Sequence, residues 1–435
     1  MNTISRRTLL AAGFAAPFVF RNFAHAAPSE TLLHVSVGAG GMARNDIGSL
    51  TASKNIKLVA VAEVDSRQLT GLLKAYPTVK VYRDWREMFE KETFDSVNVS
   101  TPDHMHACPT MRAMLMGKHV YTQKPLTQTL HECRKITEAA AANPKLITQM
   151  GIQIHSHRVH QHVVATVQSG AIGKVKEVHS WSSKTWGDDS KQPQTTEPTP
   201  KELDYDLWLG VAAARPYIGG NYYHPGNWRK RLDFGTGTFG DMGCHILDPV
   251  FGSLGVKSPK TITSSGGTPN EHHWGLNAQV RYIFPGTKFT TDEVALTWYD
   301  GSNRPPEAIT KLLGKEKLSE QGSIYIGERA VFYTPYIGPP KIIDNGEVQM
   351  NGVAEPKGDN HYSQFVDAAR GTATASAPFS YAGPLTEMVL LGCLATRFPK
   401  TALKWDTAKM EFVNNPKATE FVKRNVRKGW EEKGI

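Results

Sequence analysis

The chain has 435 residues, of which 40% are hydrophobic and 21% are charged, and its formal net charge is +9. These proportions are those of a globular protein, and they exclude wholesale disorder and fibrous repeats, while the length favours two or three domains. Residues 1–26 hold three of the positive charges and no acid, so +6 is left for the remaining chain. The basic residues of the remaining chain form no cluster interleaved with aromatic residues, which argues against nucleic-acid binding.

Residues 1–26 have the layout of an export signal. Arg6 and Arg7 precede an apolar stretch, and Ala24-His25-Ala26 forms a small-x-small cleavage site. The paired arginines predict the twin-arginine route and a periplasmic location; the alternative is an ordinary secretory signal with two adjacent arginines. Neither this stretch nor any later one is long enough to span a bilayer. The four cysteines show no C-x-x-C spacing, so we expect free and mostly buried thiols rather than a disulfide framework.

The first predicted strand, residues 32–37, leads directly into a glycine-rich turn. The turn reads G-x-G-x-x-A from Gly38 to Ala43. The first glycine permits a tight turn, the second lets backbone amides approach a pyrophosphate, and the small Ala43 allows close packing of helix on strand. The predicted cofactor contacts here are Gly38, Gly40, Gly41 and Met42.

The second predicted strand, residues 56–62, ends in an acid. Glu63 follows Gly38 by 25 residues, the distance at which an acid accepts hydrogen bonds from a ribose diol and repels a 2′-phosphate. Glu63 therefore favours NAD, although the nearby Arg67 leaves NADP possible. Asp65 is a second candidate for the ribose, and the alternative for Glu63 is a solvated acid at a strand end.

The third predicted strand, residues 96–100, is followed by a polar loop and by a helix that begins near Cys108. Strands alternating with helices predict a doubly wound parallel sheet whose ligand lies at the carboxyl ends of the strands. Lys124, after the next strand, falls on the same edge, and Pro125 constrains its backbone. The loop candidates for the cofactor are Thr101, Pro102, His104 and His106, with the histidines equally interpretable as loop or core residues.

A second reactive segment lies between Gly235 and Asp248. Asp241 and His245 are four residues apart, and therefore share one face of a predicted helix. Alcohol oxidation needs a base of near-neutral pKa to take the hydroxyl proton, and His245 is the natural base, with Asp241 orienting it or the substrate. A surface ion pair and a metal pair are the alternatives.

These motifs together resemble the Gfo/Idh/MocA family of nicotinamide-dependent oxidoreductases. The resemblance rests on G-x-G-x-x-A, on the acid after the second strand, on G-K-H-V-x-x-x-K-P, and on D-x-G-x-H-x-x-D after a glycine-rich approach. It implies a catalytic set of Lys124, Asp241 and His245, with Lys124 also touching cofactor and substrate. The family usually has Glu-Lys-Pro where this chain has Gln123-Lys124-Pro125, so the acid that would tune the lysine is missing.

The remaining candidates are less specific. Gln153 is a further predicted cofactor contact, and His155 a further substrate contact. Trp186, Trp228 and Arg229 belong to a region rich in aromatic residues. Tyrosine and tryptophan faces stack on sugar rings, and arginine binds hydroxyls, but these aromatic residues are also interpretable as core. Histidines 155, 157, 160 and 162 are interpreted as helix surface, because no acid stands at ligand spacing, and no metal is predicted. The substrate candidates are Lys124, His155, Trp186, Trp228, Arg229, Asp241 and His245.

The predicted fold is α/β: a Rossmann domain over residues 31–151, then an α+β domain over residues 152–435 with a large, open, mainly antiparallel sheet. By analogy with the family, the second domain binds a carbohydrate substrate and forms a homo-oligomer, a dimer or a tetramer. The expected activity is NAD(P)-dependent oxidation of a hydroxyl of a sugar, sugar derivative or glycoside, with a tightly held cofactor. The alternatives are an NAD-dependent glycoside hydrolase that oxidises its sugar transiently, and a sensor of sugars or nucleotides without catalytic activity.

Overall fold

Six short apolar segments of the N-terminal half form one parallel sheet. A computed structural model describes residues 31–435, and the predicted export signal lies outside the described residues. The sheet order is β3-β2-β1-β4-β5-β6. Strands β4 and β6 are buried throughout, as expected when helices cover both faces. The strands are β1 (Leu32–Val37), β2 (Ile56–Ala62), β3 (Lys80–Tyr82), β4 (Ser96–Val99), β5 (His119–Gln123) and β6 (Thr148–Gly151).

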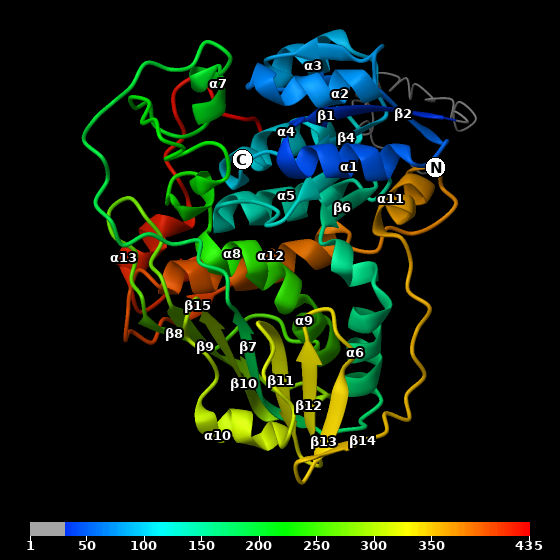
Figure 1. Ribbon diagram of the computed structural model, residues 1–435, viewed down its shortest axis with the longest axis vertical. Helices are drawn as coiled ribbons and strands as arrows, with labels where there is room; N and C mark the ends of the chain where they lie inside the picture. Colours follow the sequence, from blue (N-terminus) through cyan, green and yellow to red (C-terminus); the bar gives the residue numbers. More distant parts are fainter. Residues whose placement is uncertain (1–30) are drawn as a thin grey trace, which may run out of the picture. The chain divides into compact units, whose positions relative to one another are not determined.

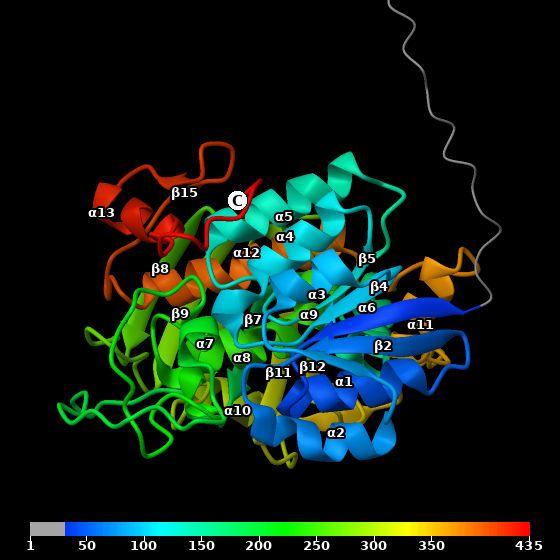
Figure 2. The same cartoon turned by 90° about the horizontal axis from the view of Figure 1, so that it is seen from above.

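Helices cover this sheet on both sides. Figure 2 shows α1 and α2 on one face and α3, α4 and α5 on the other. The strand order reverses between β1 and β4, so a ligand crevice is expected at their carboxyl ends. These helices are α1 (Gly41–Thr51), α2 (Leu69–Ala75), α3 (Trp85–Lys91), α4 (Ala107–Leu115) and α5 (Leu130–Ala142). The predicted doubly wound parallel sheet is confirmed.

The second half is built on an eight-stranded sheet of order β14-β13-β12-β11-β7-β10-β9-β8. Only β7 and β10 pair in parallel; the other neighbours are antiparallel, as predicted. The strands are β7 (Val175–Ser182), β8 (Thr261–Gly266), β9 (Ala278–Pro285), β10 (Thr290–Asp300), β11 (Gln321–Gly327), β12 (Val331–Pro335), β13 (Lys341–Asp344) and β14 (Glu347–Gln349).

Two helices lie between the sheets. Figure 1 shows α8 (Gly237–Ile246) and α12 (Phe379–Ala395) in this middle layer, and α12 contacts α5, β6, α8 and β8. Thirteen of the seventeen residues of α12 are buried, because a helix that is apolar on all sides needs protein around it. The sequence predicts this helix only from Leu385; in the structure it begins six residues earlier and accommodates Pro384.

The other elements are short or peripheral. They are α6 (Arg158–Gln168), α7 (Tyr205–Leu209), α9 (Asp248–Leu254), α10 (Glu307–Thr310), α11 (His361–Ala369), α13 (Pro416–Thr419), β15 (Trp405–Asp406) and β16 (Glu411–Phe412), with short 3-10 turns between them. All four cysteines are buried and free, as expected. Within residues 31–435, none of the helices combines the length and the apolarity that crossing a bilayer requires.

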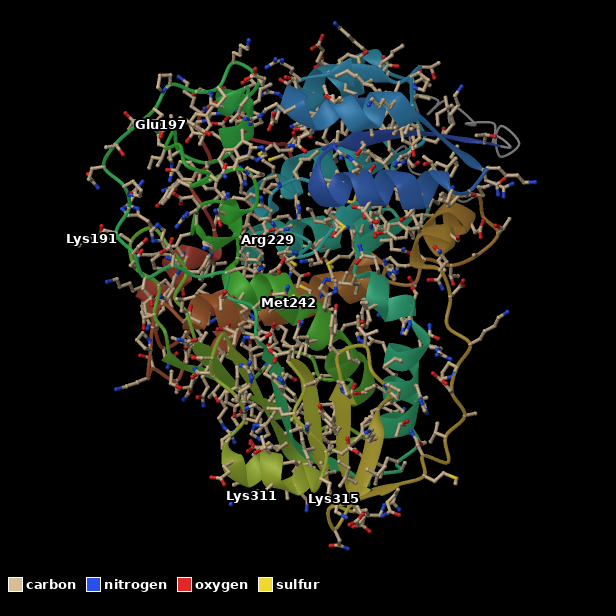
Figure 3. The ribbon with its side chains drawn as sticks, in the orientation of Figure 1. Lys191, Glu197, Arg229, Met242, Lys311 and Lys315 are labelled. Carbon is tan, nitrogen blue, oxygen red and sulfur yellow. The ribbon has the colours of Figure 1, made fainter. Side chains whose placement is uncertain are left out.

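One irregular stretch of the C-terminal half contacts the N-terminal half. We call residues 200–234 the crossing segment. Its backbone hydrogen-bonds to the loop after β2, where Ser66 N donates to Glu202 O at 3.0 Å and Asp204 N donates to Val64 O at 2.8 Å. The preceding Pro/Thr-rich stretch, which includes Lys191 and Glu197, runs along the outside (Figure 3). The crossing segment thus lies directly against the predicted nucleotide edge.

Candidate active site

A cavity of about 340 Å³ opens at the carboxyl ends of β1, β2 and β4. Gly38, in the turn after β1, has a φ of +100°, and a Cβ built on it would lie 2.7 Å from Ser100 O. Only glycine fits that conformation and that space. The predicted cofactor contacts that line the cavity are Gly38, Gly40, Gly41, Met42, Glu63, Thr101 and Pro102.

Glu63 holds the shape of the glycine-rich turn. Its Oε2 accepts hydrogen bonds from Ala39 N at 2.8 Å and Gly40 N at 3.2 Å, and its Oε1 accepts one from Asp65 N at 2.9 Å. Burial raises the pKa of Glu63, although these backbone donors oppose the rise. Its contact with a ribose stays a prediction; its place on the cavity wall is consistent with that role.

The carboxylate of Asp65 contacts both Arg67 and His224. Arg67 Nε and Nη2 donate to its two carboxylate oxygens at 2.7 and 2.8 Å, and His224 Nε2 lies 2.9 Å from Oδ2. Burial alone would raise the pKa of Asp65, but these partners hold it at about 2. Because Arg67 is neutralised in this bidentate pair, it is not free to bind a 2′-phosphate.

The crossing segment forms the opposite wall of the cavity. His224, Trp228 and Arg229 all line it. The Arg229 guanidinium lies 4.2 Å above the ring of Trp228 and 5.4 Å from that of Trp186, an arrangement that favours a cation. One face of Trp228 is therefore covered, and a sugar could stack there only after Arg229 moved. Trp228 also packs into a cluster with Trp208 and Phe234, so the core interpretation applies to it as well.

Arg229 connects the cavity to the predicted catalytic residues. Its Nε lies 3.2 Å from Asp241 Oδ1, and Lys124 Nζ donates to the same oxygen at 2.7 Å and to Asp241 O at 2.9 Å. The side chains of Lys124 and Asp241 are only 11% and 14% exposed. Burial alone would raise the pKa of Asp241, but Lys124 and Arg229 keep it far below its usual range. Figure 3 places Arg229 near Met242, the residue after Asp241 on α8.

His245 lies one turn further along α8, and its pKa differs from the near-neutral value expected from the sequence. No residue in the part of the chain that the structure describes hydrogen-bonds to its ring, and its Nδ1 is buried. Burial, reinforced by Lys124, lowers the pKa of His245 to about 3, so the imidazole is neutral near pH 7. The near-neutral pKa expected from the sequence is therefore corrected, because that expectation took no account of burial beside a cation.

The pKa of His155 is shifted in the opposite direction to that of His245. Its Nδ1 lies 2.9 and 3.0 Å from the two oxygens of Asp248, which also accepts a hydrogen bond from Tyr381 at 2.6 Å. Burial would lower the pKa of His155, but the charge and hydrogen bonds of Asp248 outweigh it and raise that pKa. His160 Nδ1 lies 3.6 Å from Asp248 and is buried, so His160 is not the surface residue predicted. The pKa values of His155 and His245 are thus shifted in opposite directions.

The His155–Asp248 pair should make stability depend on pH. Compared with His155→Gln, the wild type should be more stable by about 2 kcal/mol, the value of a hydrogen bond between charged groups. Because the folded pKa is raised, this difference is complete below pH 6.5, the reference pKa of histidine, and disappears as pH rises through the folded pKa. Thermal unfolding of both proteins at increasing pH measures it. The exposed His272→Gln is the control, and a difference that did not change with pH would contradict the pairing.

The structure places His104 and His106, two of the predicted cofactor contacts, away from the cavity wall. Both side chains are buried. His104 Nε2 bonds to Trp208 O at 3.1 Å, whereas His106 bridges Thr101 O at 2.9 Å and Pro125 O at 2.7 Å. His106 therefore fastens the backbone beside Lys124 to the end of β4. A short polar loop motif shows the residue type but not the direction of the side chain, which is why both were taken as ligand contacts.

The amide of Gln123 has a buried acid as its partner. Gln123 Nε2 donates to the Asp46 carboxylate at 2.8 and 3.0 Å, and Ser100 and Tyr362 donate to it as well. Burial raises the pKa of Asp46 to about 6 despite these bonds. Gln153 joins the same network through Tyr362 at 3.1 Å and does not line the cavity. Sequence analysis missed Asp46, because nothing in the pattern of α1 distinguishes it from a surface acid.

Gln68 and Arg83 are among the residues of the cavity wall that were not predicted from the sequence. Gln68 packs so closely over Gly40 that a Cβ there would lie 2.7 Å from its Oε1. Its position five residues after Glu63 was the only available signal. Within residues 31–435, no group of three or more His, Cys, Asp or Glu side chains is arranged so that it could hold a metal ion.

Family profiles match both halves of the chain. The Gfo/Idh/MocA oxidoreductase family, described as an NAD-binding Rossmann fold, matches residues 33–151, and the C-terminal alpha/beta domain of the same family matches residues 157–287. The chain belongs to the Gfo/Idh/MocA oxidoreductase family. The resemblance inferred from the motifs is thus confirmed, as is an NAD-binding Rossmann domain.

Individual relatives are distant. An inositol 2-dehydrogenase of Rubrobacter xylanophilus is 27% identical over 154 residues, which are 35% of this chain and 44% of the relative. Another, from Salmonella typhimurium, is 25% identical over 178 residues, or 40% of this chain and 53% of the relative. The chain therefore spans about half the length of these relatives.

Solved structures share the fold over a longer stretch. The WlbA dehydrogenase of Chromobactrium violaceum, in complex with NADH and UDP-GlcNAcA, has a TM-score of 0.61 at 16% identity, covering 87% of this chain and 97% of that one. An oxidoreductase of Agrobacterium radiobacter in complex with NAD+, L-tartaric acid and magnesium has a TM-score of 0.56 at 14% identity, with 86% and 98% covered. At such identities the likeness shows the fold alone.

Proposed function

We propose that this Gfo/Idh/MocA protein oxidises a secondary hydroxyl of a sugar, sugar derivative or glycoside, with NAD as the hydride acceptor. The observation that carries the proposal is Arg229, which lines the nucleotide cavity and bonds to Asp241, the partner of Lys124. This contact joins the glycine-rich turn to the polar set on α8. The inositol 2-dehydrogenases among the relatives support a polyhydroxylated substrate.

The residues of the cavity fit a dinucleotide. The turn from Gly38 leads into the start of α1, where free backbone amides favour a pyrophosphate. Glu63 supplies an acid on the cavity wall, and Arg67 is already paired with Asp65. This arrangement supports NAD rather than NADP. Bound NAD would supply the hydride acceptor.

Side chains of the protein would bind the substrate and transfer its proton. Lys124 would hold the reacting hydroxyl and stabilise the negative charge that develops on its oxygen. The neutral imidazole of His245 would take the proton at Nε2, since Nδ1 is buried; its lowered pKa makes it a weaker base than the near-neutral one expected from the sequence. Asp241 would keep Lys124 and Arg229 in place. Such a step needs the substrate to enter between Arg229 and Asp241.

The crossing segment supports a tightly held cofactor. It closes over the cavity through backbone bonds at residues 64–66 and through the His224–Asp65 contact at 2.9 Å. An exported enzyme meets no free NAD pool, so retention suits the proposed periplasmic location. We further propose a dimer or a tetramer formed by the large sheet, by analogy with the family.

Retention predicts an effect of the crossing segment on nucleotide release. We expect bound NAD to remain with the wild-type protein through gel filtration and to be lost from His224→Ala, which removes a cavity wall and the contact to Asp65. Absorbance and mass spectrometry of the eluted protein measure the nucleotide. His272→Ala, an exposed histidine, is the control. Nucleotide lost equally from the wild type would refute retention.

A second candidate function is redox-assisted glycoside cleavage, and His155 favours it. Asp248 raises the pKa of His155 and so favours its protonated form, which could donate a proton to a leaving oxygen, a step that simple alcohol oxidation does not need. The two functions differ in the fate of the cofactor. The test is anaerobic incubation of the loaded protein with a panel of sugars, cyclitols and glycosides. A lasting rise in reduced-nicotinamide absorbance supports oxidation, cleavage without net change supports the hydrolase, and neither with any compound would refute both.

A further inference from the structure

A second cavity, of about 400 Å³, lies on the far side of the glycine-rich approach to α8. Residues of α12, of the crossing segment and of the C-terminal tail line it. Its wall is largely apolar, with Val211, Leu232, Leu390 and Phe421 among the lining side chains. The nucleotide cavity shares no lining residue with it. It is therefore a separate space, and the proposed oxidation does not use it.

Arg397 is the distinctive side chain of this cavity. Its guanidinium lies 4.7 Å from the ring of Phe421 and 5.2 Å from that of Trp274. Contact with two aromatic rings restricts the planar group while leaving the N–H donors at its edge available. Among residues 31–435, no oxygen accepts a hydrogen bond from these donors. Burial lowers the pKa of Arg397, and Asp233 only partly offsets this effect.

The other charged groups of the cavity compensate the charge of Arg397 only in part. Asp233 forms an ion pair with Arg215, and Arg424 forms one with Glu132 at 3.0 Å. Lys423 adds a second cation to the lining, whereas Glu271 is exposed at the rim. Arg397 is partly buried, and a guanidinium at a cavity wall without a carboxylate partner can bind an anion that enters the cavity. Within residues 31–435, neither Asp233 nor Glu271, the carboxylates that line this cavity, forms an ion pair with Arg397.

We propose that this cavity binds a small organic anion, a carboxylate or a phosphate monoester with an apolar or ring-shaped body. The two oxygens of such a group would accept the paired N–H donors of Arg397. The body would lie against Leu232, Leu390 and Phe421. Thr236, which precedes α8 and donates to Asp103 at 2.6 Å, also lines the cavity. A bound anion would thus contact the segment that positions Asp241 and His245.

The test uses the full chain saturated with NAD, so that the nucleotide cavity is already filled. Benzoate and phenyl phosphate are the anionic probes, and benzamide is the neutral probe of matched shape. Titration calorimetry should give a Kd of about 1 mM or tighter for at least one anion, and no binding of benzamide. The stronger of the two anions identifies the headgroup. Absence of binding by both anions would overturn the proposal.

Variants locate the bound anion. Arg397→Met keeps the length of the side chain and removes the charge, and should weaken binding at least tenfold. Arg397→Lys keeps the charge without the two-pronged geometry and should lose part of the affinity; it also serves if the methionine variant fails to fold. Arg329→Met, at an exposed arginine of another region, is the control. Equal affinity in the wild type and in either Arg397 variant would overturn the assignment, whatever the outcome of the activity assays.

Discussion

Lys124→Met is expected to lower kcat by about 10³-fold, the loss seen when a group that stabilises developing charge is removed. The substrate is the one that the panel of sugars and cyclitols identifies. Lys124 lies 2.7 Å from Asp241 and is only 11% exposed, so its ammonium group is largely shielded from solvent. The bound nucleotide should be retained, because Lys124 does not line the nucleotide cavity. Single-turnover absorbance and nucleotide content are measured on the same preparation.

The control for this variant is Lys145→Met, at an exposed lysine before β6. It should leave kcat and nucleotide content unchanged. Lys124→Met also leaves Asp241 with Arg229 as its remaining cationic partner at 3.2 Å, so a drop in Tm is expected. Unchanged turnover in Lys124→Met with intact folding would remove Lys124 from the mechanism and leave the proposed oxidation without its electrophile.

Gly38→Ala is expected to weaken nucleotide binding by about 100-fold or more, which corresponds to about 2.7 kcal/mol. Gly38 has a φ of +100°, which a side chain makes unfavourable, and the new Cβ would lie 2.7 Å from Ser100 O. The turn between β1 and α1 would have to shift, and with it the backbone amides that face the cavity. Calorimetric titration with NAD after removal of any bound nucleotide measures the change.

Gly48→Ala is the matched control. Gly48 lies within α1, and a Cβ there meets no atom within 4 Å. Alanine is the better helix former, so this variant should gain up to about 1 kcal/mol of stability and bind NAD as the wild type does. If both variants bound NAD equally, the glycine-rich turn would not be the nucleotide site. Loss of binding in Gly48→Ala would instead point to α1 as a whole.

Individual strands and helices of this protein can be predicted from its sequence, because they depend on residues that are close together in the chain. Strands β1 and β2 begin and end where the apolar runs do, and Glu63 stands at the end of β2. Helix α8 does place Asp241 and His245 on one segment, as their spacing of four predicts. The structure also brings Lys124, 117 residues away in the chain, into contact with Asp241. That pairing was expected only through the family resemblance, since spacing alone says nothing of it.

The polar loop after β4 illustrates what a pattern cannot convey. His104 and His106 were read as ligand contacts from their place at the strand edge, yet both side chains turn into the protein and bond to backbone oxygens. The protonation states of His155 and His245 likewise follow from burial and from Asp248 and Lys124. Residue type gives the reference pKa, but only the packed environment gives its shift.

The sequence by itself determined the strands and helices, the family and the edge of the sheet at which a nucleotide is expected, because short-range apolar periodicity and glycine turns encode them. Only the tertiary structure decided which distant groups meet: Arg229 with Asp241, Gln123 with Asp46, and the crossing segment with the loop after β2. It also shows that no acceptor within residues 31–435 bonds to Arg397. The physical reason is that desolvation and long-range pairing depend on which residues far apart in the sequence come into contact. A single sequence carries no local signal for those contacts.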